Sequence, residues 1–98
     1  MDTLNGIVRT AMTAYARKGL NSHSYLTHSD DNSILSVVTV PVGKGSSFTS
    51  LLVRIFAETI IIERDQNDKP LVDALVQAGI PRSQIILAYA GESVPQSA

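Results

Sequence analysis

The stretch LLVRIFAETIIIERDQNDKPLVDALVQAGIPRSQIILAY, residues Leu51–Tyr89, decides the fold of this 98-residue chain. It opens with two runs of β-branched and large apolar residues, Leu51–Ala57 and Ile60–Arg64, and such residues favour strands. Only Glu58 and Thr59 separate the two runs, so the sequence predicts a hairpin. The separating residues include neither Gly nor Asn, which leaves the turn type open and allows a looser or bulged loop.

A helix is predicted near residues 69–78, after a polar break. Pro70 suits the first turn of a helix, where its missing N–H costs nothing. The expected N-cap is Asp68 or Lys69. Asp68 is chemically the better cap, because its carboxylate can accept hydrogen bonds from the exposed backbone N–H groups of the first turn.

The far end of this helix carries the strongest local signal in the chain. Leu71 and Leu75 recur at helical spacing on the apolar side. Gly79 follows where a left-handed residue is wanted, and the apolar residue Ile80 and a proline come next. Residues 85–89 are short, apolar and bounded by polar residues, so they predict a buried strand.

The first half of the chain predicts one helix and then strands. Residues 1–18 read as an amphipathic helix with Asp2 or Thr3 as its cap. Residues 24–27 form a possible short strand, and residues 34–42 form a clearer one. The residues expected on the apolar face of the first helix are Leu4, Ile7, Val8, Ala11, Met12 and Tyr15, and those expected on one face of the clearer strand are Leu35, Val37 and Thr39.

These elements predict an α+β fold of one domain, residues 1–98, whose residues 92–98 form a frayed tail. The expected architecture is an N-terminal helix, a mostly antiparallel sheet of four to five strands with a hairpin near 51–64, a second helix near 69–78 packed on the sheet, and a final strand near 85–89. Parallel pairing is possible only across the second helix.

Composition narrows the function classes. Apolar residues make up 44% of the chain and charged residues only 17%, which favours a homo-oligomer or an obligate partner over a free monomer. The net charge is −1 and no Lys/Arg cluster occurs, which argues against tight non-specific binding to nucleic acid. The absence of Cys excludes disulfides and thiol chemistry. No apolar run is long enough for a membrane span and no signal pattern opens the chain, so a cytoplasmic protein is expected.

Three sequence features invite a reading as functional sites. Residues 43–47 (GKGSS) suggest a phosphate loop, but they lack the upstream Gly and precede a strand, so a surface loop is favoured. His23 and His28 could bind a metal with Asp30 or Asp31, although two solvated histidines are the better interpretation.

The third feature is a set of four carboxylates, which could bind a divalent ion or form an acid/base pair: Glu58, Glu63, Asp65 and Asp68. A solvated strand face, a turn and a helix cap explain them better. The sequence therefore assigns no catalytic, cofactor-binding or metal-binding residue, and no cofactor.

The chain resembles the XisI-like family, the fdxN element excision controlling factors of cyanobacteria. The segments that carry the resemblance are the start of the first helix at residues 1–4, VRI at 53–55, IIIERD at 60–65, LVQAGIP at 75–81 and IILAY at 85–89. The resemblance implies a non-enzymatic accessory protein that acts by protein–protein contact in control of DNA-element excision. It also implies a nuclease-like XisH protein as partner, with any DNA binding indirect.

Two alternatives remain open from the sequence. One is a regulatory protein that binds DNA directly through Arg9, Arg17, Lys18, Lys44 and Arg54, with an affinity that falls steeply with salt. The other is a small metal-dependent or hydrolytic enzyme built on the carboxylates or the histidines.

Overall fold

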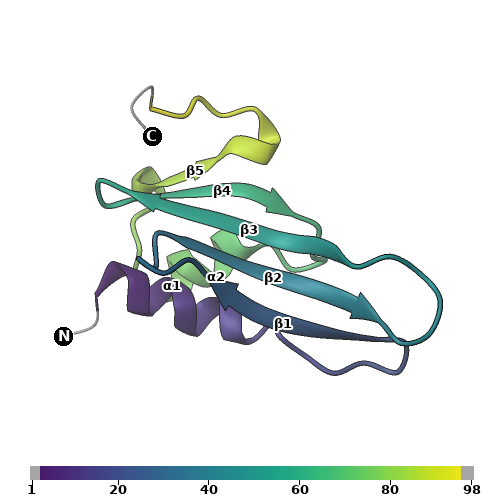
Figure 1. Cartoon of the computed structure of the whole chain (residues 1–98). Coiled ribbons are helices and arrows are strands. Elements are labelled where there is room, and N and C mark those ends of the chain that lie inside the picture. The colour runs from purple at the N-terminus through teal and green to yellow at the C-terminus, as the bar shows by residue number, and fades with distance from the viewer. Residues whose placement is uncertain (1–2, 96–98) are drawn as a thin grey trace.

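A five-stranded sheet runs through the molecule, in the order β1-β2-β3-β4-β5 (Figure 1). The structure is a computed structural model and describes residues 3–95. The first four strands pair antiparallel, and β4 and β5 pair parallel across the helix α2. This confirms the α+β prediction. The elements are α1 (Leu4–Thr13), β1 (Ser22–His28), β2 (Ile34–Pro41), β3 (Phe48–Phe56), β4 (Thr59–Asp65), α2 (Leu71–Gln77), η1 (Arg82–Gln84), β5 (Ile85–Leu87) and η2 (Ala88–Ala90).

The predicted hairpin is β3–β4, and its turn has two residues rather than the looser or bulged loop that the sequence also allowed. Phe56 lies opposite Thr59, so the turn residues are Ala57 and Glu58, one position earlier than expected. Both have positive φ, at 49° and 62°, as a turn that matches the twist of the strands requires. Neither is Gly or Asn, so the turn carries backbone strain that the paired strands impose on it.

The start of α2 corrects the predicted cap. Pro70 is the N-cap and has no side-chain oxygen to offer. Asp65, at the end of β4, supplies the acceptor instead: its Oδ2 accepts from the N–H of Leu71 at 2.8 Å, and its Oδ1 accepts from the N–H of Asn67 at 3.0 Å. Asp68 makes no such bond within residues 3–95, so the prediction of Asp68 or Lys69 as the cap was wrong.

The end of α2 follows the prediction. Gly79 has a φ of +100°, and its N–H donates to the carbonyl of Val76 at 3.0 Å. The N–H of Ile80 donates to the carbonyl of Leu75 at 3.0 Å, and the side chain of Ile80 is buried. The helix therefore ends in a C-cap motif in which Gly79 alone is left-handed. The strand after it is shorter than predicted, because the chain turns into η2 after Leu87 rather than continuing to residue 89.

The first helix is also shorter than predicted. Thr3 caps it, with its Oγ1 accepting from the N–H of Gly6 at 3.0 Å, and the helix ends at Thr13 rather than residue 18. The chain after it turns to meet β1, where Lys18 forms an isolated antiparallel β-bridge with His23 through backbone pairing. Residues 1–2 of the predicted helix lie outside the described residues. No helix in residues 3–95 is long and apolar enough to cross a membrane.

Both helices pack on one face of the sheet, which we call the inner face (Figure 1). The predicted strand pattern holds there, because Leu35, Val37 and Thr39 of β2 are all buried. The core on this face consists of Val8, Met12, Leu35, Val37, Leu51, Val53, Ile60, Ile62, Leu71, Leu75, Ile80 and Ile85. Within residues 3–95, neither α1 nor α2 lies on the opposite face, which we call the outer face.

Candidate functional site

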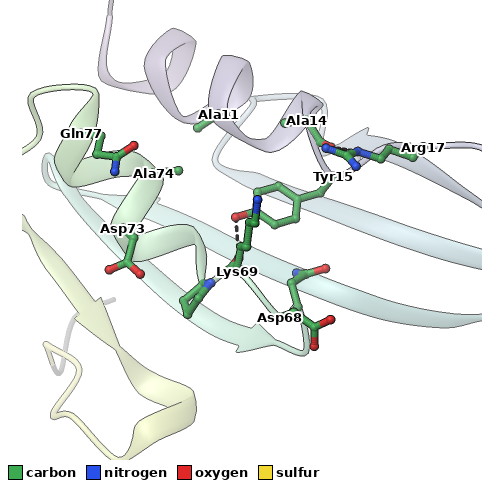
Figure 2. Close-up of a pocket in the computed structure, with 11 residues that line it drawn as sticks. Ala11, Ala14, Tyr15, Arg17, Asp68, Lys69, Asp73, Ala74 and Gln77 are labelled. Atoms are coloured by element: carbon green, nitrogen blue, oxygen red, sulfur yellow. Dashed lines mark hydrogen bonds between the residues drawn. The ribbon is translucent and has the colours of Figure 1, made fainter.

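A groove of about 840 Å³ lies between α1 and α2 (Figure 2). Small side chains form it, because the alanines of the two facing helices leave space above the core. Charged and polar side chains of both signs surround it. Its lining residues are Ala11, Ala14, Tyr15, Arg17, Asn67, Asp68, Lys69, Pro70, Asp73, Ala74 and Gln77.

Tyr15, in the turn that follows α1, reaches across this groove (Figure 2). Its hydroxyl donates to the carbonyl of Lys69 at 2.7 Å. Burial raises the pKa of Tyr15, and the carboxylates of Asp65 and Asp73 raise it further. The phenol therefore keeps its proton at neutral pH and ties α1 to the segment before α2 instead of acting as a base.

The four predicted carboxylates have separate structural roles. Glu58 lies in the hairpin turn, Glu63 pairs with Arg54 across β3 and β4, and Asp65 caps α2. Asp68 is exposed at the rim of the groove. Within residues 3–95, no group of three or more His, Cys, Asp or Glu side chains could hold a metal ion.

The two histidines are likewise not brought together. The ring of His23 packs edge-on against Tyr25, with 6.4 Å between ring centroids, while Nδ1 of His28 lies 2.9 Å from the carbonyl of Ser29. Asp31 closes the β1–β2 turn, because its Oδ1 accepts from the backbone and side chain of Ser33 and from the hydroxyl of Ser29. These hydrogen bonds, first the one from the Ser33 backbone, lower the pKa of Asp31 to about 2.

The remaining sequence candidates are equally dispersed. Residues 43–47 connect β2 to β3 and lead into a strand, as expected for a surface loop. The basic residues proposed for DNA binding come from α1, from the segment after it, from this loop and from β3. Arg54 is neutralised by Glu63, and Nε of Arg17 donates to the carbonyl of Ala14 at 2.8 Å. The five residues thus come from four different segments of the chain.

The outer face of the sheet is covered unevenly. Ile61 of β4 is fully buried there, on the side where η2 contacts β4. In contrast, Tyr25, Ile34 and Val40 are exposed by 49%, 39% and 37%. Cross-strand pairing places Tyr25 beside Val38, in the part of the face formed by β1 and β2. We call Tyr25, Ile34, Val38 and Val40 the outer patch.

Sequence reasoning singled out neither the groove nor the outer patch. The patch had a signal in the sequence, since Val38 and Val40 are apolar residues on the face of β2 that points away from the core. The groove had only the alanines of two helices far apart in the chain, and their spacing gave no indication that the helices would meet.

Comparison with known proteins identifies the family. The sequence model of the family described as XisI protein matches residues 3–97. No curated protein matches the chain. Among solved structures, a XisI-like protein from Anabaena variabilis ATCC 29413 is similar with a TM-score of 0.74 and 18% sequence identity, over 87% of this chain and 85% of that one.

A second solved structure is the fdxN element excision controlling factor XisI, also from Anabaena variabilis ATCC 29413. It matches with a TM-score of 0.59 and 19% identity, over 93% of this chain and 86% of that one. These two likenesses show a shared fold, and the family match covers nearly all of the sequence. The chain therefore belongs to the XisI protein family.

Proposed function

We propose that this protein is a non-enzymatic accessory factor that controls excision of a DNA element through protein–protein contacts. Membership of the XisI family supports the role in excision control, together with the likeness to the fdxN element excision controlling factor from Anabaena variabilis. The partner is the nuclease-like XisH protein that the resemblance implies, and contact with DNA is made through that partner.

The outer patch is the observation that carries this proposal. An apolar surface on the sheet face without a helix is typical of a binding surface, since exposed apolar area gains free energy when a partner covers it. Tyr25 supplies an aromatic anchor, with Val38 directly opposite it and Val40 next on the same face of β2. Ile34 lies further along that face, beyond the hydroxyl pair of Thr27 and Ser36. The ion pair of Arg54 with Glu63 lies beside Ile34 on the same face and gives the patch a polar border.

Binding to a purified XisH-like protein tests the proposal. Val40→Glu places a carboxylate in the patch and should weaken binding by about tenfold or more, because the charge would be buried without a partner. Val76→Glu is the control, since Val76 is 44% exposed on α2, far from the outer face. Calorimetry of both variants measures the difference. Absence of binding by the unaltered protein, or equal losses in the two variants, would contradict the proposal.

A further inference from the structure

The outward edge of β5 is closed by two side chains instead of a further strand. Within residues 3–95, β5 pairs only with β4, so the backbone groups of Ile85 and Leu87 point away from the sheet. The N–H of Ile85 donates to the carbonyl of Arg82, and the carbonyl of Ile85 accepts from Nη1 of Arg82 at 2.7 Å. The N–H of Leu87 donates to Oε1 of Glu92 at 2.8 Å, and the carbonyl of Leu87 accepts from the N–H of Glu92 at 3.1 Å.

Arg82 and Glu92 also pair with each other, and we call the two residues the clasp. Nη2 of Arg82 lies 2.9 Å from Oε2 of Glu92. The hydrogen bond from the backbone of Leu87, and then the one from Arg82, lower the pKa of Glu92, so the clasp is charged at neutral pH. The predicted frayed tail begins at Glu92, and these hydrogen bonds correct the prediction at that residue. Residues 96–98 of the predicted tail lie outside the described residues.

The segment that the clasp encloses has the composition of a strand that pairs with copies of itself. Residues 85–90 read IILAYA, with no charged residue, no Pro and no Gly. Short segments of this kind pair with identical segments when their backbone groups are exposed. Arg82 lies before the segment and Glu92 after it, which is where natural sequences place charges that prevent such pairing.

Apolar side chains lie exposed beside this edge. Tyr89, within the segment, is 42% exposed, and Val76 of α2 is 44% exposed. Val76 and Arg82 line one shallow hollow of about 490 Å³, so the exposed valine lies close to the clasp. A strand added at β5 would therefore cover apolar side chains as well as bond to the backbone, and this combination makes an edge prone to association.

We propose that the clasp is an autoinhibitory contact, which prevents residues 85–90 from pairing with the same segment of a second copy. Opening the clasp exposes the N–H of Leu87 as a donor and the carbonyls of Ile85 and Leu87 as acceptors. One edge then carries both kinds of group, so two copies of it can satisfy each other. The occupant is a second copy because identical apolar segments are complementary to one another, and only 17% of the residues of the chain are charged to oppose their contact.

Sedimentation velocity of the full chain over a range of concentrations tests the clasp. Glu92→Ala removes the acceptor for the N–H of Leu87 and the partner of Arg82, and it should strengthen self-association by about tenfold or more. Arg82→Ala opens the clasp from the other side and should have the same effect, although it changes the net charge in the opposite direction. Asp68→Ala and Arg9→Ala are the matched controls, since both residues are exposed and neither makes an ion pair within residues 3–95.

A second substitution separates pairing through β5 from a general loss of stability. Tyr89→Lys places a charge within residues 85–90, and in the Glu92→Ala chain it should return association to the level of the unaltered protein. Asp65→Ala removes the cap of α2 but keeps the clasp, so it should associate no more than the unaltered protein. Association that persists after Tyr89→Lys, or that is equal in Asp65→Ala and Glu92→Ala, would overturn the proposal. A Glu92→Ala chain that associates no more than Asp68→Ala would overturn it as well.

Hydrogen exchange checks the clasp without any association. In dilute protein, the amide of Leu87 should exchange faster in Glu92→Ala than in the unaltered chain, because its acceptor is gone. Unchanged exchange at Leu87 would refute the closed edge. This inference does not depend on excision control, because both measurements are made without a partner or DNA.

Discussion

β4 and β1 are strands of equal length with opposite burial. Ile60, Ile61 and Ile62 of β4 are fully buried, so both faces of that strand are covered. No residue of β1 is fully buried, and Tyr25 is half exposed. The difference shows that β4 is buried on both faces of the sheet, whereas β1 leaves apolar side chains such as Tyr25 exposed to solvent.

The largest expected effect compares two isoleucines in one cross-strand row. Ile34 of β2 and Ile61 of β4 lie on either side of Arg54 on the outer face. Ile61→Ala should lower the free energy of unfolding by about 2–5 kcal/mol, because it leaves a cavity at a fully buried site. Ile34→Ala should cost less than about 1 kcal/mol. Urea denaturation measures both, and equal losses would contradict the contrast in burial between the two sites.

The next prediction concerns the cap of α2 and the contribution of Asp65 to stability. Asp65→Ala removes the acceptor for the N–H groups of Leu71 and Asn67 and should destabilise the fold by about 1–2 kcal/mol. Asp68→Ala, three residues away and exposed, should change stability by less than about 0.5 kcal/mol. Thermal unfolding of the pair distinguishes them. A larger loss of stability in Asp68→Ala than in Asp65→Ala would show that Asp68 is the functional cap, as the sequence predicted.

A substitution in the strained turn of the β3–β4 hairpin should stabilise the protein, whereas the substitutions above destabilise it. Glu58→Gly should stabilise the protein by about 0.5–1 kcal/mol, because Gly adopts the positive φ of this position without steric cost. The carbonyl of residue 58 remains available to Nε2 of Gln84. Glu58→Ala keeps the strain and serves as the control. If the two variants unfold at the same urea concentration, φ strain at residue 58 is not the reason for any gain.

The smallest expected effect lies in the β1–β2 turn and depends on pH. In the folded chain the pKa of Asp31 is lowered from 3.8 to about 2. The ionised carboxylate therefore stabilises the folded state at pH values above the ordinary pKa of 3.8. That contribution is lost as the pH falls from about 4 to about 2. Asp31→Asn should therefore have a lower urea midpoint than the unaltered chain near neutral pH, and the difference should vanish near pH 2. A difference independent of pH would contradict this assignment.

The element order could be predicted from sequence because its signals are local. The β-branched runs and the Gly79-Ile80 helix end each act within a few residues. The errors arose where a distant residue decides the outcome. Asp65 caps a helix that begins six residues later, a spacing outside the usual cap pattern. After α1 the chain pairs Lys18 with His23, and the N–H of Leu87 at the end of β5 donates to Glu92, so both contacts join separate segments.

The candidate surfaces were harder to predict than the elements. The outer patch exists because both helices pack on the same face of the sheet, and no local pattern reports which face a helix will take. The groove lies where α1 meets α2, and the hydrogen bond from Tyr15 to Lys69 in it joins residues far apart in sequence. The sequence could predict apolar residues in excess, but their position depends on the register between β1 and β2.

Arg82 and Glu92 cover the outward edge of β5, because Nη1 of Arg82 donates to the carbonyl of Ile85 at 2.7 Å and the N–H of Leu87 donates to Oε1 of Glu92 at 2.8 Å. A sheet with two free edges can recruit neighbour after neighbour and grow into a fibre. Here Arg82 and Glu92 occupy the β5 edge, so a further strand cannot add there without displacing them. A chain with only 17% charged residues therefore cannot extend its sheet at both edges, which is the geometry that fibre growth requires.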